Sequence, residues 1–178
     1  PEDLDRAACL QAAVVLIPGR TQSAGSLVSS IAAFREYQME KAWTWELQAL
    51  TRARFVAGDP ALAGQFKRIR ADVLCRDRDE AGLVSELAEM RRRMAEEQVA
   101  RSGGDPLSGK HRAGGLVDIE FIVQYAVLRW AHDYPDLTEW TDNARLLDRL
   151  AQHGLLPDRS FGQPLLATSP ATKGQRSL

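Results

Sequence analysis

Three polar side chains interrupt the most apolar part of the sequence, AGGLVDIEFIVQY at 113–125. Asp118, Glu120 and Gln124 lie in a run that is otherwise hydrophobic as far as Trp130. Burying an unpaired carboxylate is costly, so each side chain needs a partner, water or a ligand. Glu120 could be a structural anchor paired with an arginine of a neighbouring helix, and Asp118 could be a carboxylate that suits a helix start. Alternatively, one or both could face a nucleotide or metal site. The spacing leaves both open.

A helical wheel separates these residues. At about 100° per residue, Asp118 lies on a side that can face water, and Glu120 and Gln124 lie nearly opposite. Glu120 and Gln124 are four residues apart and are therefore neighbours. We predict that these two point inward, toward protein or a cleft. Asp118 in the first turn suits the helix dipole.

Lys110 is a candidate anion contact because it precedes Gly114, Gly115 and the start of a predicted helix. Backbone N–H groups at a helix N-terminus, glycine freedom and a lysine can together hold an anion. The segment is not a Walker loop, since no GxxxxGK[ST] occurs and no strand precedes it.

Two arginines are further candidates. Arg52 lies four residues after Gln48, on the Trp45 side of its predicted helix, and Arg91 lies nearest the seam formed by Leu87 and Met94. An arginine in such a position can stack on an aromatic ring, pair with a carboxylate or hold a phosphate. No serine, cysteine or histidine is spaced as a recognisable nucleophile–base pair.

These residues require helices to position them. Hydrophobic spacing and capping residues predict helices at 31–57, 60–75, 79–100, 116–133 and 141–154. Ser29 or Ser30, Asp59, Asp77 or Asp79, and Thr141 are the predicted caps. A short strand at 12–17 is the one extended element. The predicted fold is an all-α bundle of about five helices with at most one short N-terminal strand. It comprises an irregular segment at 1–28, a helical domain at 29–157 and a loose tail at 158–178.

Composition excludes several classes of protein. The chain has 178 residues, 26% of them charged, and a net charge of -1, which does not suit a nucleic-acid-binding protein. No apolar run is long enough to span a membrane, and the first residues do not resemble a signal peptide. Two cysteines and three scattered histidines form no metal-binding pattern, and we expect free thiols in a reducing, cytoplasmic compartment.

Four stretches, in this order, resemble one family. They are FREYQMEKAWTWELQALTRARFVAGDP at 34–60, EMRRRM at 89–94, KHRAGGLVDIEFIVQY at 110–125 and WTDNARLLDRLAQHGLL at 140–156. They resemble the C-terminal, adenylyl-transferring half of bacterial glutamine synthetase adenylyltransferase/adenylyl-removing enzymes. The resemblance covers residues 25 to 156. Its motif or interface residues here are Trp45, Glu46, Gly114, Gly115, Asp118, Gln124, Asp142 and Asn143.

The resemblance implies AMP transfer from ATP to a tyrosine of glutamine synthetase, with Mg²⁺. Lys110, Arg52 and Arg91 would contact phosphates, and Glu120 would position one of them. The partners implied are glutamine synthetase, ATP and a PII-type signal protein. The family's Gly-Ser-Asp-x-Asp metal motif is missing from this sequence, and no Asp or Glu lies between Arg6 and Arg35. We therefore expect no catalytic or metal-binding residue and no tightly bound cofactor in this chain, which would be inactive alone. The alternative is a protein-binding module that docks glutamine synthetase or a PII-type regulator without a nucleotide site.

Overall fold

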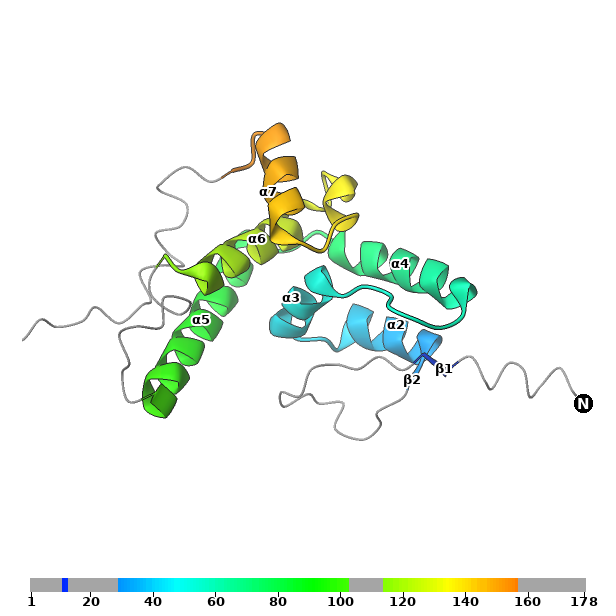
Figure 1. Ribbon diagram of the computed structural model, residues 1–178, viewed down its shortest axis with the longest axis horizontal. Helices are drawn as coiled ribbons and strands as arrows, with labels where there is room; N and C mark the ends of the chain where they lie inside the picture. Colours follow the sequence, from blue (N-terminus) through cyan, green and yellow to red (C-terminus); the bar gives the residue numbers. More distant parts are fainter. Residues whose placement is uncertain (1–10, 13–28, 103–113, 157–178) are drawn as a thin grey trace, which may run out of the picture.

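The computed structural model describes residues 11–12, 29–102 and 114–156, and Figure 1 shows their arrangement. Six α-helices account for most of these residues, which confirms the predicted all-α class. They are α2 (Ile31–Glu40), α3 (Thr44–Arg52), α4 (Pro60–Leu74), α5 (Glu80–Ser102), α6 (Leu116–Trp130) and α7 (Asn143–Gln152). A 3-10 helix, η1 (Pro135–Thr138), joins α6 to α7.

Extended structure in the described residues is limited to two pairs of residues. β1 (Gln11–Ala12) pairs antiparallel with β2 (Ser29–Ser30), which leads directly into α2. Of the strand predicted at 12–17, only Ala12 is described. The predicted tail at 158–178 and most of the segment at 1–28 lie outside the described residues.

The prediction of one continuous helix at 31–57 is wrong, because the chain forms two helices, α2 and α3, in this range. The carbonyl of Tyr37 accepts the N–H groups of both Lys41 and Ala42 at 2.9 Å, which ends α2. Glu46 then accepts the N–H of Trp43 at 2.9 Å and starts α3. Ala53 is extended, so α3 ends well before Gly58. The sequence did not indicate this break, because apolar residues occur on both sides of the predicted helix and leave no periodic signal where its axis changes.

Capping side chains define most other helix starts. Ser30 accepts the N–H of Ala33 at 3.1 Å and Asp59 that of Ala61 at 2.8 Å, which confirms these two predicted caps. At α7 the prediction was off by one residue. Asp142, rather than Thr141, is the cap, and it accepts the N–H of Arg145 at 3.0 Å.

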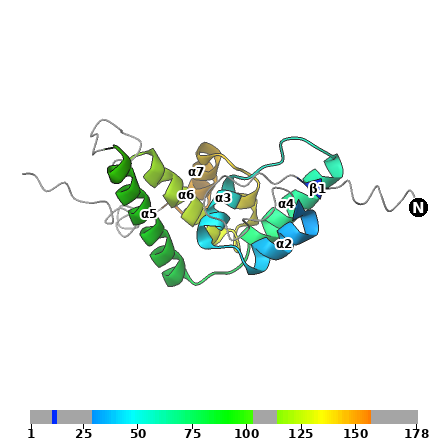
Figure 2. The same ribbon diagram turned by 90° about the horizontal axis from the view of Figure 1, so that it is seen from below.

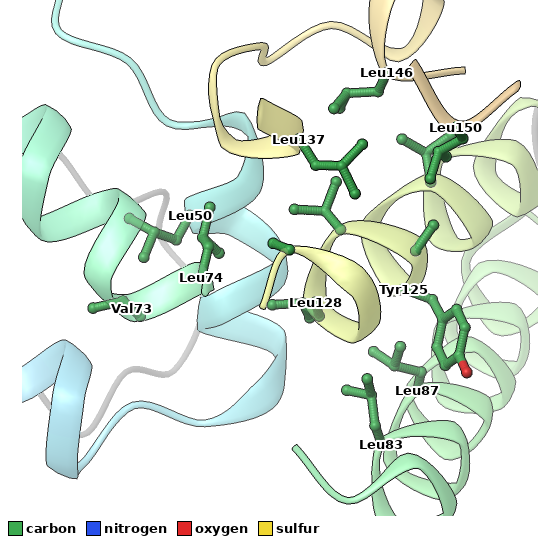
Figure 3. Packing of buried hydrophobic residues seen from close by; sticks show 14 of the residues in the cluster. Leu50, Val73, Leu74, Leu83, Leu87, Tyr125, Leu128, Leu137, Leu146 and Leu150 are labelled. Carbon is green, nitrogen blue, oxygen red and sulfur yellow. The ribbon is translucent and has the colours of Figure 1, made fainter. Parts of the chain in front are cut away.

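The core is built around α6, which is apolar on nearly every side and contacts α3, α5, α7 and η1. Figures 1 and 2 show α5 at one end of the molecule, α2 and α4 at the other, and α3 between them. Leucines from α4, α5, η1 and α7 converge on α6 (Figure 3). The largest fully buried side chains are Leu74, Leu87, Tyr125, Leu128, Leu137, Leu146 and Leu150. Among the described helices, none has the length and hydrophobicity needed to cross a membrane.

Candidate functional site

A ladder of polar side chains joins α3 to α6. Gln48 donates from Nε2 to Oε1 of Gln124 at 2.9 Å. One helical turn further, Nη1 of Arg52 lies 3.5 Å from Oε1 of Glu120. Residue numbers rise on α3 as they fall on α6, so the two helices run antiparallel along this ladder. Gln124 and Glu120 therefore contact a neighbouring helix, as the predicted inward orientation requires.

A third helix completes the outer end of the ladder. Nη1 of Arg52 also donates to Oδ1 of Asn143, the first residue of α7, at 3.0 Å. We refer to Arg52, Glu120 and Asn143 as the Arg52 cluster. The side chains of Arg52 and Glu120 are 41% and 32% exposed, so the cluster lies at the surface. The structure thus brings together two predicted nucleotide contacts and one predicted motif residue from three helices.

The geometry leaves part of the Arg52 guanidinium available. Within the described part of the chain, its contacts are made through Nη1 alone. The N–H groups of Nε and Nη2 are parallel donors, the arrangement that binds carboxylate or phosphate in two hydrogen bonds. Glu120 reduces the local positive charge but fixes the orientation of the guanidinium. The Arg52 cluster can therefore hold an anion at the surface.

Asp118 belongs to a second, buried cluster. Its Oδ1 lies 2.5 Å from Nε of Arg91 on α5, and both side chains are only 3% exposed. Its Oδ2 accepts the N–H of Gly114 at 2.6 Å. Gly114 has a φ of +76°, in the left-handed region that glycine tolerates, and Gly115 then caps α6. Arg91 presents almost no surface to a phosphate, which favours a structural role.

The wheel placed Asp118 on a side of the helix that can face water, but in the structure its side chain is buried. Asp118 and Glu120 do point to opposite sides of α6, since two residues turn a helix by about 200°. However, α5 covers the Asp118 side, where Arg129 and Tyr125 also reach Glu80 of α5 at 3.2 and 3.4 Å. Because α6 is apolar nearly all round, the wheel separated the two sides without indicating which one is covered.

Glu46 anchors the break between α2 and α3. It is 2% exposed, and its two carboxylate oxygens accept the Tyr37 hydroxyl at 2.8 Å each. With its bond to the N–H of Trp43, this carboxylate links three positions across the break. Burial, together with the hydrogen bond and the negative charge of Glu46, raises the pKa of Tyr37 to about 12. Glu46 is therefore a structural residue of this motif.

The raised pKa of Tyr37 predicts a loss of stability in alkali. Its folded-state pKa is about 12 against an ordinary 10.0, so the protonated phenol stabilises the fold below pH 10. That contribution is lost as the pH rises through about 12. We expect Tyr37→Phe to flatten the decline in the free energy of unfolding over this range, measured by urea denaturation. Tyr125, whose pKa burial and Glu80 raise to about 12, contributes to the remaining decline. Cys75 and Lys41, whose pKa values are raised by burial and by Glu36 respectively, contribute in the same direction. An equally steep decline in Tyr37→Phe would contradict the assignment.

A hollow of about 230 Å³ lies between α3 and α5, and Trp45 lines it. Trp43 lies beside Trp45 with ring centres 6.4 Å apart, and Trp43 is 47% exposed. The hollow also borders the polar ladder through Gln48. Its lining residues are Trp43, Thr44, Trp45, Gln48, Glu86, Leu87, Glu89, Met90 and Arg93.

Two predicted residues, Asp142 and Lys110, remain to be placed. Asp142 serves as the cap of α7 and so places Asn143. Lys110 lies outside the described residues. The described residues contain no group of three or more His, Cys, Asp or Glu side chains that could hold a metal ion.

Several known proteins are similar in sequence to this chain. Residues 20–69 match the family model for glutamate-ammonia ligase adenylyltransferase. A bifunctional glutamine synthetase adenylyltransferase/adenylyl-removing enzyme of Hahella chejuensis is 47% identical over 137 residues, and one of Aromatoleum aromaticum is 50% identical over 133 residues. Each alignment covers 75% of this chain. The chain belongs to the glutamine synthetase adenylyltransferase family.

Membership confirms the resemblance seen in the sequence motifs. The chain spans 14% of the length of each of these adenylyltransferases, so it corresponds to one segment of them. That segment folds here into α-helices, as expected for a helical part of the enzyme. Among the described residues, the predicted nucleotide contacts Arg52 and Glu120 lie at the surface, in the Arg52 cluster.

Proposed function

We propose that this chain is the helical part of an enzyme that transfers AMP from ATP to a tyrosine of glutamine synthetase, and that Arg52 contacts the nucleotide phosphates. Family membership supports the reaction. One observation supports the residue: Nη1 of Arg52 is fixed by Glu120 and Asn143, while its Nε–Nη2 edge has no partner within the described residues. A half-exposed, oriented guanidinium is suited to bidentate binding of phosphate.

In this reaction the tyrosine oxygen forms a bond to the α-phosphorus of ATP, and the bond to pyrophosphate breaks. Negative charge builds on the leaving pyrophosphate. Arg52 would stabilise this charge because its donors are already oriented, which is how preorganised groups favour a transition state. Mg²⁺, when bound, would supply further neutralisation of this charge. We still predict that the chain alone does not transfer AMP.

Calorimetric titration of the purified chain with ATP and with pyrophosphate tests the phosphate contact. We expect Arg52→Ala to weaken both about 10- to 100-fold, because a hydrogen bond to a charged group contributes about 1.5–3 kcal/mol. Arg52→Lys should retain part of the affinity as a point charge. Arg54→Ala is the matched control, since Arg54 is an exposed arginine two residues away. Equal effects of Arg52→Ala and Arg54→Ala would mean that net charge, rather than the Arg52 cluster, attracts the anion.

The second candidate function is a protein-binding module, and the half-exposed Trp43 beside the α3–α5 hollow favours it. Aromatic residues are enriched at protein interfaces. The partner would be glutamine synthetase or a PII-type signal protein. In that case the chain would bind glutamine synthetase in surface plasmon resonance, Trp43→Ala would abolish the binding, and ATP would give no heat. Retained affinity in Trp43→Ala would exclude the hollow as the contact.

A further inference from the structure

Arg70 of α4 is a buried arginine that binds only backbone carbonyls among its described hydrogen-bond partners. It is 5% exposed. Nε donates to the carbonyl of Leu50 at 2.9 Å, and Nη2 donates to those of Thr51 and, at 3.1 Å, Trp140. Nη1 donates to the carbonyl of Thr138. A single guanidinium therefore makes four hydrogen bonds to two separate segments of the chain.

Those two segments carry the Arg52 cluster. Leu50 and Thr51 form the last turn of α3, immediately before Arg52. Thr138 is the last residue of η1, and Trp140 lies between η1 and α7, three residues before Asn143. The carbonyls at the end of a helix carry partial negative charge, which a buried cation offsets. Burial lowers the pKa of Arg70 to about 10, so the side chain remains charged at neutral pH.

We propose that Arg70 is a positioning residue for the Arg52 cluster, because it holds the end of α3 against the start of α7 so that Arg52 and Asn143 meet. Arg70 is buried and does not itself contact the anion. The consequence for anion binding rests on the proposed function, whereas the consequence for the geometry of the cluster does not. The sequence contains one indication that Arg70 is buried. It follows Ile69 and precedes Val73, and all three residues are buried in α4.

Arg78 provides a matched control within the same molecule. Its guanidinium also donates to several backbone carbonyls, and burial also lowers its pKa to about 10. The acceptors lie at the end of α4, just after it and in α6, rather than in α3 or before α7. They are the carbonyls of Val73, Leu74, Arg76 and Leu128. Loss of Arg78 should therefore destabilise the fold without moving the Arg52 cluster.

The test compares Arg70→Met with Arg78→Met in the full chain. Both should lower the melting temperature. At a temperature where both are folded, Arg70→Met should weaken pyrophosphate binding about tenfold, and Arg78→Met should leave it nearly unchanged. Arg70→Met should add nothing to Arg52→Ala in the double variant, since coupled residues are not additive. If Arg70→Met does not fold, Arg70→Lys takes its place, because lysine keeps the charge but cannot reach four carbonyls.

NMR spectra separate failure of this inference from failure of the proposed function. The Nε–H signal of Arg52 and the side-chain amide signals of Asn143 report the cluster without any ligand. We expect both to shift in the Arg70 variant and neither to shift in Arg78→Met. If these shifts occur but the wild-type chain binds no pyrophosphate, phosphate binding by Arg52 is refuted, and positioning of the Arg52 cluster by Arg70 is supported. Unchanged signals in the Arg70 variant, or equal shifts in both variants, would overturn the positioning role.

Discussion

Replacing Asp118 with alanine is expected to lower the free energy of unfolding by about 3–5 kcal/mol, the usual cost of breaking a buried ion pair. The Arg91 guanidinium would lose the carboxylate 2.5 Å away in an environment where both side chains are 3% exposed. The N–H of Gly114 would also lose its acceptor at the start of α6. Urea denaturation of the purified chain measures this effect.

Two further variants identify the cause. Arg91→Met/Asp118→Leu should be less destabilised than Asp118→Ala, because replacing both charges leaves no desolvated ion. Arg92→Ala is the control on the same helix. Arg92 pairs with Glu89 and Glu96 but is 43% exposed, so its loss should change stability little. A cost in Asp118→Ala no greater than in Arg92→Ala would show that the buried pair does not stabilise the fold.

Glu46→Ala should lower the free energy of unfolding by about 2.5–4 kcal/mol. Of this, about 1 kcal/mol reflects the lost helix cap at Trp43, and about 1.5–3 kcal/mol reflects the charged hydrogen bond with Tyr37. The tyrosine hydroxyl and the Trp43 N–H would both lose the partner that joins α2 to α3. Thermal or urea unfolding followed by far-ultraviolet circular dichroism measures the loss.

Glu46→Gln separates shape from charge, since an amide oxygen can still accept one of these bonds. We expect a smaller loss than in Glu46→Ala. Glu36→Ala is the matched control: Glu36 is on α2, its side chain is 59% exposed, and it pairs with the exposed Lys41. Comparable losses in Glu36→Ala and Glu46→Ala would mean that general helix propensity, and not the buried carboxylate, determines the effect.

Periodicity and capping residues predicted the helical class, the helices at α4, α5, α6 and α7, and the ends set by Ser30 and Asp59. They could not predict the break at 41–43. A helix that is apolar on two sides has no periodic signal at a change of axis, and the cap there is a glutamate acting from within the helix. Tertiary contacts, especially Tyr37 with Glu46, determine the break.

The candidate site was only partly predictable, because spacing describes one helix at a time. Spacing indicated that Glu120 and Gln124 are neighbours that point inward, and each does contact α3. It could not assign partners across helices, so the pairing of Arg91 with Asp118 and the four carbonyls around Arg70 were missed. Both depend on which face of α6 or α4 is covered. That choice is made by packing between helices far apart in the sequence.

The hydrogen bond between Arg52 and Asn143 spans 91 residues of sequence. Contacts of such long range require closure of a large loop and slow the folding of a chain. The Arg52 cluster is therefore complete only when α3, α6 and α7 have all docked. A ligand that binds there would select the fully docked chain over partly folded forms, and above its Kd it would raise the melting temperature roughly with the logarithm of its concentration. Nucleotide binding at the Arg52 cluster, as proposed, would therefore report how completely these three helices have docked.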